Sequence, residues 1–126
     1  MTRHVLLIED NEQNRYLTTF LLEKSGYRVT SAVTGPDGIE LARGGAFDLI
    51  LLDIQLPAMD GYAVAAALKA DPRTRGVPIV AVTSHAMVGD REKALASGAQ
   101  GYIEKPIDPE TFVTEVERFF PSRGVQ

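Results

Sequence analysis

The sequence contains no cysteine and only two histidines among its 126 residues. Without cysteine the chain has no disulfide, no thiolate nucleophile and no thiol-bound metal, which is compatible with a reducing compartment. Two histidines give little support for a zinc site, because such sites draw most of their ligands from cysteine and histidine. The chemistry of the chain must therefore rest on other side chains.

Long apolar runs are also missing. The first apolar run, residues 5–8, is only four residues long. That is too short for the core of a signal peptide and far short of the roughly 20 residues that span a bilayer. We therefore expect a cytoplasmic protein that does not act at a membrane.

Basic charge is not in excess. Lys and Arg number 13 and Asp and Glu number 17, for a formal net charge of −4. Nucleic-acid binders need a basic face, so this balance argues against a nucleic acid as partner. An acidic ion-binding site fits the charge better.

Length and composition indicate one folded domain. At about 100–200 residues per domain, 126 residues leave no room for a second one. Hydrophobic residues make up 44% and charged residues 24%, which is typical of globular domains. We expect one domain over residues 1–126, in which 121–126 form a polar tail. Whether Gln126 is the natural end, or the tail begins a linker, stays open at this point.

Short apolar segments with turn residues between them predict a parallel β-sheet. Four of them lack alternation, as strands buried on both faces do: residues 5–8, 48–52, 78–82 and 102–103. A fifth segment, residues 27–32, alternates and is rich in strand-forming residues, which indicates an edge strand. The stretches between them have helical periodicity. Five β–α units predict an α/β fold with a parallel sheet and helices on both faces.

Capping signals set the expected helix boundaries. The expected N-terminal caps are Asp10 with Gln13, Thr34 with Asp37, and Asp108 before Pro109. Gly26 and Gly98 follow helical patterns at positions where C-terminal caps are needed.

Polar side chains follow four of the five predicted strands: Glu9 and Asp10, Asp53, Thr83, and Glu104 with Lys105. In open parallel sheets, ligands bind beyond the carboxyl ends of the strands. Three carboxylates placed together raise one another's pKa, so a positive group should share the site. Lys105 and a divalent cation are both candidates. Oxygen ligands without histidine or cysteine favour Mg²⁺.

Asp53 is the best candidate for a nucleophile, because apolar residues flank it and its strand should lie on the central side of the sheet. A carboxylate can attack phosphorus while a metal, an ammonium group and a hydroxyl neutralise charge on the phosphoryl oxygens. Lys105 and Thr83 can supply the last two groups, and Glu9 and Asp10 are then metal ligands, direct or through water. Taken singly, Asp10 is as typical of a helix cap as of a metal ligand, and Asp53 is more typical of a turn residue than of a nucleophile.

In order and spacing, these residues resemble the receiver domain of two-component response regulators. The resemblance covers roughly positions 4 to 120 and rests on four motifs: residues 8–11 (IEDN), 53–61 (DIQLPAMDG), 82–83 (VT) and 98–106 (GAQGYIEKP). It implies a flavodoxin-like (βα)5 fold with strand order 2-1-3-4-5. It also implies a phosphorylation-controlled switch in signal transduction rather than a turnover enzyme.

The resemblance implies the chemistry of the site. Asp53 accepts a phosphoryl group from a histidine kinase or a histidine phosphotransfer protein, and Thr83 and Lys105 complete the catalytic set. The Mg²⁺ cofactor is held by Asp10, Asp53 and the main-chain carbonyl of Gln55, with Glu9 reaching it through water.

The resemblance also implies how the site reports its state. Thr83 turns toward the phosphoryl group and Tyr102 turns inward. Output then passes to a downstream protein through the face formed by the fourth helix, fifth strand and fifth helix. The Lys105–Pro106 bond is expected to be cis.

Three positions vary from the commonest family pattern or leave a property open. Glu9 replaces the aspartate that often stands first in the acidic pair, a variant that the family accepts. Gln55 and His85 occupy positions that influence the rate of dephosphorylation in the family, and their identities leave that rate open.

Other functions are weighed against the receiver. A phosphatase of the haloacid dehalogenase type also uses a strand-end aspartate and Mg²⁺, but it needs a second aspartate where Gln55 stands. A flavodoxin shares the strand order, but the acidic residues 9–12 would repel its phosphate. An interaction module with an inactive site is a third alternative. It is disfavoured because every reactive position of the family is filled in this sequence. Among receivers, the alternative is a module cut from a hybrid histidine kinase or larger regulator.

The remaining residues have simpler expectations. His85 is expected in a loop and His4 at the surface, and Met59 and Met87 are expected to be packing residues. By itself, Tyr102 is typical of a half-buried packing aromatic.

Overall fold

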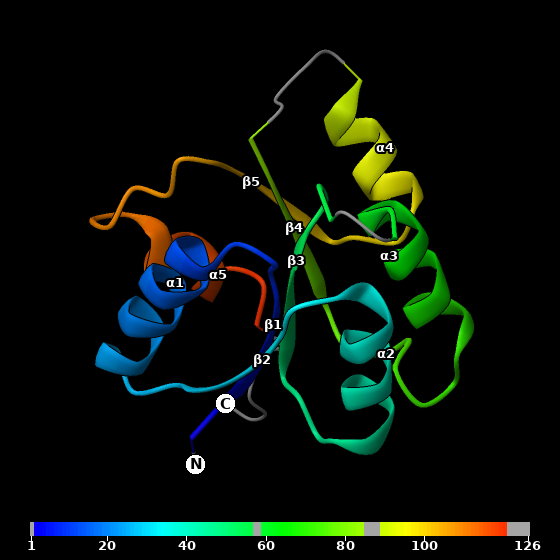
Figure 1. The fold of residues 1–126 in the computed structure, drawn as a ribbon, viewed down its shortest axis with the longest axis horizontal. Coiled ribbons are helices and arrows are strands. Elements are labelled where there is room, and N and C mark those ends of the chain that lie inside the picture. Colours follow the sequence, from blue (N-terminus) through cyan, green and yellow to red (C-terminus); the bar gives the residue numbers. More distant parts are fainter. Residues whose placement is uncertain (1, 57–58, 85–88, 121–126) are drawn as a thin grey trace.

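The computed structural model describes residues 2–56, 59–84 and 89–120. Its strands and helices alternate strictly along the chain (Figure 1). The elements are β1 (His4–Ile8), α1 (Glu12–Lys24), β2 (Arg28–Ala32), α2 (Gly35–Gly44), β3 (Leu49–Asp53), α3 (Gly61–Ala70), β4 (Ile79–Thr83), α4 (Asp90–Ala96), β5 (Gly101–Glu104) and α5 (Phe112–Glu117).

The five strands form one parallel sheet in the order β2-β1-β3-β4-β5. This confirms the predicted fold class and strand order. Strands β3 and β4 are buried at every residue, whereas β2 has one buried residue and lies at the edge. The difference follows from the sequence, because the inner strands are continuous apolar runs and β2 alternates.

Each face of the sheet packs against its own helices. In Figure 1, α1 and α5 cover one face, and α2, α3 and α4 lie on the other. Successive strand residues alternate between two cores: Leu49 and Leu51 pack toward Phe112 and Val116, while Ile50 and Leu52 pack toward α2 and α3. Within the described part of the chain, none of the helices has the length and apolar character needed to cross a bilayer.

The N-terminal caps agree with the sequence at one helix and differ at two. Thr34 caps α2 as expected, its hydroxyl accepting from the Asp37 amide at 3.2 Å. The expected Asp10 cap is wrong, because Asn11 caps α1 by accepting from the Asn14 amide at 2.9 Å. Asp10 lies one residue earlier, in the loop that follows β1.

The last helix begins later than predicted. Its first residue is Phe112, after Thr111, instead of Pro109. The Asp108 carboxylate accepts from the Glu110 amide at 2.9 Å, so it stabilises a turn that precedes the helix.

The backbone expectations hold where they can be compared. Gly26 and Gly98 follow α1 and α4 with φ of 95° and 113°, and the Lys105–Pro106 bond is cis. Met59 packs against the core as expected, while His85 and Met87 lie outside the described residues.

His4 is not the surface residue that was expected. It lies half-buried in β1, where its Nε2 is 2.7 Å from Thr30 Oγ1 and its ring is 4.5 Å from that of Phe47. Burial, and then the charge of Arg28, lower the pKa of this imidazole.

Gly61 lets α3 begin against the end of β3. A Cβ at Gly61 would lie 2.5 Å from Ile54 Cα and 2.7 Å from the Asp53 carbonyl oxygen. Both are backbone atoms that cannot rotate away. Gly61 therefore sets how the chain returns to the sheet beside Asp53, and its amide donates to the Ile54 carbonyl at 3.1 Å.

Gly61→Ala should destabilise the fold, because the added methyl group forces the β3–α3 connection apart. Overpacking of this kind costs about 1–3 kcal/mol, measurable as a lower free energy of unfolding in urea. Gly44→Ala is the matched control, since a Cβ there meets nothing within 4 Å. Equal stability of the two variants would contradict the proposed close approach.

Candidate functional site

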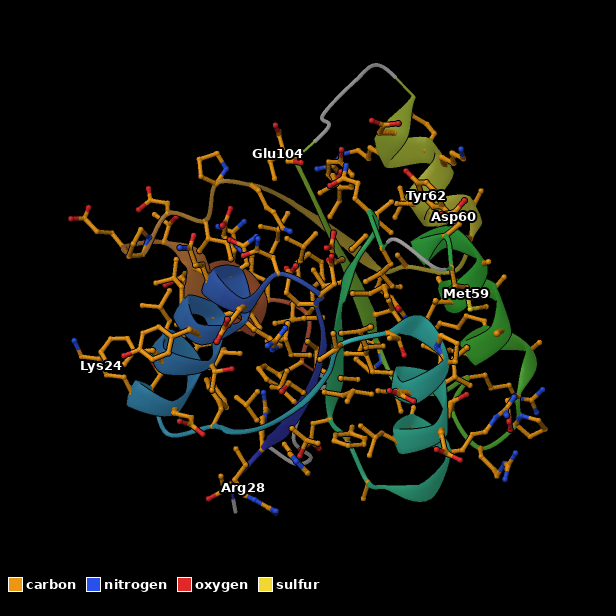
Figure 2. All side chains as sticks on the ribbon, viewed as in Figure 1. Lys24, Arg28, Met59, Asp60, Tyr62 and Glu104 are labelled. Atoms are coloured by element: carbon orange, nitrogen blue, oxygen red, sulfur yellow. The ribbon has the colours of Figure 1, made fainter. Side chains whose placement is uncertain are left out.

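Charged and hydroxyl side chains gather where the strands end. Glu104 ends β5 at the upper edge of the sheet in Figure 2, and Arg28 begins β2 at the lower edge. The residues that follow β1, β3, β4 and β5 therefore share one edge. Glu104 itself is exposed.

Glu9, Asp10 and Asp53 form an acidic cluster. One carboxylate oxygen from each lies within 4.8 Å of the others. Glu9 and Asp53 are both 3% exposed, because Glu9 follows and Asp53 ends a strand that is buried in the core. Bringing such carboxylates together out of water is unfavourable unless positive charge or hydrogen-bond donors compensate.

Lys105 supplies positive charge to this cluster. Its Nζ lies 3.0 Å from Glu9 Oε1 and 3.5 Å from Asp53 Oδ2, and the Lys105 side chain is 11% exposed. Its amide donates to the Thr83 carbonyl at 2.7 Å, which continues the β4–β5 ladder past the end of β5. The cation therefore extends from the fifth strand to carboxylates of the first and third.

The surrounding charges still leave the ionised form of Glu9 destabilised. Burial raises the pKa of Glu9 to about 7, and the neighbouring Asp53 adds to that rise, while Lys105 opposes it. One ammonium group does not fully offset two buried carboxylates. A second cation at this edge would favour the ionised form.

Backbone and arginine contacts hold the acidic residues in place. The Gln55 amide donates to Asp53 Oδ1 at 2.9 Å, and the Asn11 amide donates to Glu9 Oε2 at 3.2 Å. Arg15 Nη1 donates to the carbonyls of Glu9 and Asp10 at 3.2 and 3.1 Å. Sequence reasoning did not single out Arg15; its place in the first turns of the helix after the acidic pair was the available signal.

Thr83 is 2% exposed and lies next to the cluster in the sheet. Its Oγ1 accepts a hydrogen bond from Gln55 Nε2 at 2.6 Å. The resemblance had implied a metal-binding role for the main-chain carbonyl of Gln55 and an influence of this position on the dephosphorylation rate, but no contact with Thr83. The side-chain contact was missed, because a pairing across 28 residues depends on how two loops meet.

Tyr102, the predicted switch residue, lies in β5 and is half-buried. Its hydroxyl is buried and meets no hydrogen-bond partner among the described residues. The Arg91 guanidinium of α4 lies 5.7 Å from the centre of its ring. The ring therefore contacts the helix that the resemblance assigns to output.

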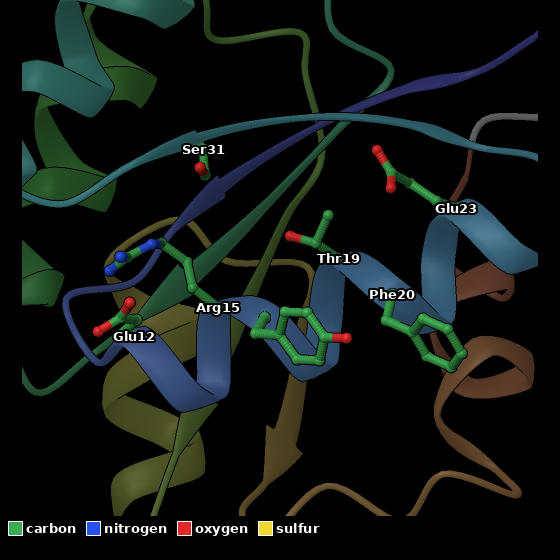
Figure 3. Close-up of a pocket in the computed structure, with 7 residues that line it drawn as sticks. Glu12, Arg15, Thr19, Phe20, Glu23 and Ser31 are labelled. Carbon is green, nitrogen blue, oxygen red and sulfur yellow. The ribbon is translucent and has the colours of Figure 1, made fainter.

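Two hollows on the surface lie outside the cluster. One, of about 310 Å³, runs along α1 beside β2, between Glu12 and Glu23, with Phe20 and Ser31 on its walls (Figure 3). The other, of about 610 Å³, includes Asp71 at the end of α3. Neither of these two hollows includes Asp53.

The acidic cluster fits a small, hard cation. Its ligand atoms are all oxygens, and among the described residues no histidine belongs to it. Opposite ligands of an octahedral Mg²⁺ lie about 4.2 Å apart. A set of three oxygens within 4.8 Å therefore suits an ion that binds one or two carboxylates directly and keeps several waters.

Comparison with known proteins gives a family. A family model, the response regulator receiver domain, matches residues 5–117. The chain belongs to the response regulator receiver family. The resemblance to this family that the sequence predicted is therefore confirmed. This receiver domain is part of two-component signalling.

One relative is the polar-differentiation response regulator DivK of Brucella ovis. The two are 41% identical over 119 residues, which cover 94% of this chain and 97% of DivK.

Two solved structures carry further information. The receiver domain of the sensor histidine kinase PA1611 of Pseudomonas aeruginosa, described with a magnesium ion in the active-site cleft, is 34% identical with a TM-score of 0.86. The match covers 94% of this receiver and 98% of the PA1611 receiver chain. The receiver domain of Saccharomyces cerevisiae Ssk1, solved with the histidine phosphotransfer protein Ypd1, is 26% identical with a TM-score of 0.86, covering 94% and 89%.

The raised pKa of Glu9 makes stability depend on pH. In metal-free buffer, unfolded Glu9 loses its proton near the usual 4.5, whereas folded Glu9 keeps it up to about 7. Its contribution to the free energy of unfolding is present in full below the lower value and is lost as the pH rises through the higher one. Glu9→Gln should remove this part of the decline in the free energy of unfolding between about pH 4.5 and about pH 7, measured by urea unfolding in EDTA.

The exposed carboxyl of Glu40 in α2 provides the control. Glu40→Gln should retain the wild-type decline. A Glu9→Gln variant with the wild-type slope would show that Glu9 ionises normally in the folded receiver.

Proposed function

We propose that this receiver domain accepts a phosphoryl group on Asp53 from a phosphohistidine and acts as a phosphorylation-controlled switch in a phosphorelay. The observation that carries the proposal is the position of Lys105, whose ammonium group lies within 3.5 Å of both Glu9 and Asp53, two members of the acidic cluster. This arrangement places a buried carboxylate, a cation and a set of oxygen ligands at one point. Phosphoryl transfer needs these three components together.

In the proposed reaction, a carboxylate oxygen of Asp53 attacks phosphorus and forms a P–O bond. The P–N bond of the phosphohistidine breaks, and its electron pair leaves with the imidazole of the donor. Hydrolysis later breaks the acyl phosphate and returns Asp53 as a carboxylate with inorganic phosphate. Each chain carries one phosphoryl group at a time, so we infer a switch rather than a turnover enzyme.

The proposed cofactor is Mg²⁺, held by Asp10, Asp53 and the main-chain carbonyl of Gln55, with Glu9 acting through water. When bound, the ion neutralises charge on the phosphoryl oxygens. The available ligand atoms support this choice, because one carboxylate oxygen from each of the three acidic side chains lies within 4.8 Å of the others. The magnesium described in the PA1611 receiver is consistent with it.

Lys105 and Thr83 complete the proposed catalytic set. Lys105 would pair with a phosphoryl oxygen, since its Nζ already lies 3.5 Å from Asp53 Oδ2. Thr83, on the neighbouring strand, would donate a hydrogen bond from its hydroxyl to another phosphoryl oxygen. Both residues are nearly buried, so their interactions with the phosphoryl group would be little screened by water.

Output through the face of α4, β5 and α5 is the proposed readout. Helix α4 has seven residues, of which Ala94 alone is buried, so few apolar contacts hold it in place. Weak anchoring is what a movable element needs. The Tyr102 ring in β5 lies 5.7 Å from the Arg91 guanidinium of this helix, and its inward turn would follow the movement of Thr83.

The proposed upstream partner is a histidine kinase or a histidine phosphotransfer protein. The Ssk1 receiver, which shares this fold, was solved with such a phosphotransfer protein. The downstream partner is proposed to be a protein.

Incubation with acetyl phosphate and Mg²⁺ tests the acceptor. Intact mass should rise by about 80 Da, the mass of one phosphoryl group on a carboxylate. Asp53→Ala should abolish the increase, and EDTA should suppress it. Asp37→Ala, which removes an exposed carboxylate from α2, is the control and should be labelled normally. Labelling that persists in Asp53→Ala would overturn the assignment.

Lys105→Ala should keep its fold but bind beryllium fluoride with Mg²⁺ at least tenfold more weakly. The physical reason is the loss of a charge-assisted hydrogen bond, worth roughly 1.5–3 kcal/mol. Binding can be measured by titration followed by NMR. Lys24→Ala, which removes an exposed lysine at the end of α1, should bind as the wild type does. Equal affinities of the two variants would remove Lys105 from the proposed set.

A further inference from the structure

The side chain of Gln55 joins the loops that follow β3 and β4. Its Nε2 donates to Thr83 Oγ1 at 2.6 Å. Its Oε1 accepts from the Ser84 amide at 3.1 Å and from the Ser84 hydroxyl at 3.0 Å. Three hydrogen bonds thus connect Gln55 to consecutive residues of the next strand end. We name this set, Gln55 with Thr83 and Ser84, the amide clamp.

The chemistry of the donors determines the direction of each bond in the clamp. A backbone amide can only donate, so the Gln55 atom facing the Ser84 amide must be its carbonyl oxygen. The NH₂ group therefore faces Thr83, and Thr83 Oγ1 is the acceptor. The Thr83 hydroxyl is consequently held toward Gln55 by a donor that is itself oriented by Ser84.

We infer that Gln55 is a positioning residue that holds Thr83 in its resting conformation through the amide clamp. The inference rests on the proposed function, in which Thr83 turns to donate to a phosphoryl group on Asp53. A rotation of Thr83 that carries Oγ1 away from Gln55 Nε2 breaks the hydrogen bond between these two atoms. This role belongs to the side chain of Gln55 and is separate from its main-chain carbonyl.

The clamp biases an equilibrium between resting and switched forms. Some ligands bind the switched form better than the resting form. Any interaction made only in the resting form lowers the apparent affinity of such a ligand. One neutral hydrogen bond of typical net strength changes such an equilibrium by about fivefold. Removing the clamp should therefore tighten the binding of a phosphoryl analogue by about this factor.

Gln55→Met tests the clamp, because methionine has a similar length and neither donates to Thr83 nor accepts strongly from Ser84. The probe is beryllium fluoride with Mg²⁺, titrated while the amide resonances of Thr83 and of Asp90–Ala96 are followed. We expect Gln55→Met to bind about fivefold more tightly than the wild type. Ser84→Ala, which removes one of the three bonds, should shift affinity in the same direction by less.

A matched control separates the clamp from a general effect of methionine. Gln13→Met changes an exposed glutamine on α1 and should leave affinity unchanged. Before the probe is added, Gln55→Met should already move the Thr83 and α4 resonances part-way to their bound positions. A purely structural role would instead lower thermal stability and shift only neighbouring residues.

The outcomes distinguish this inference from the proposed function. Wild-type affinity or weaker binding in Gln55→Met, with a wild type that binds the probe, overturns the clamp and leaves phosphorylation of Asp53 standing. A wild type that neither binds beryllium fluoride nor is labelled by acetyl phosphate overturns the proposed function, and the clamp with it.

Discussion

The ion pairs of Lys105 with Glu9 and Asp53 are the interaction on which the site depends. Two carboxylates are nearly excluded from water at the ends of apolar strands, and such groups are stable as anions only with compensation. The ammonium group of Lys105 and two backbone amides supply part of it. The raised pKa of Glu9 is consistent with incomplete compensation. A cation bound at this edge would add to it.

The sheet gives this cluster a rigid base. The inner strands β3 and β4 are buried along their whole length, so the ends that carry Asp53 and Thr83 have little freedom to move. The absence of a side chain at Gly61 lets the next helix begin directly beside Asp53. By contrast, only Ala94 is buried in α4. A rigid reactive edge next to a loosely held helix is an arrangement in which a local change of charge can be transmitted.

Much of this arrangement was predictable from the sequence. The five strands, the edge position of the alternating segment and the gathering of Glu9, Asp10, Asp53, Thr83 and Lys105 at one edge were all expected. Helix boundaries were less predictable, because neighbouring polar residues compete for the same cap. Asn11 rather than Asp10 caps α1, and Asp108 stabilises a turn before the last helix. His4, expected at the surface, packs against Phe47.

The sequence by itself determined the fold class and the chemistry available at the site, because apolar strand interiors and polar strand ends are local patterns that one topology turns into a shared edge. Tertiary structure decided the contacts within that edge. The amide clamp of Gln55 with Thr83 and Ser84 and the hold of Arg15 on two carbonyls depend on side-chain directions that no local pattern specifies. Clamp partners about 28 residues apart meet only when adjacent strands bring their loops together.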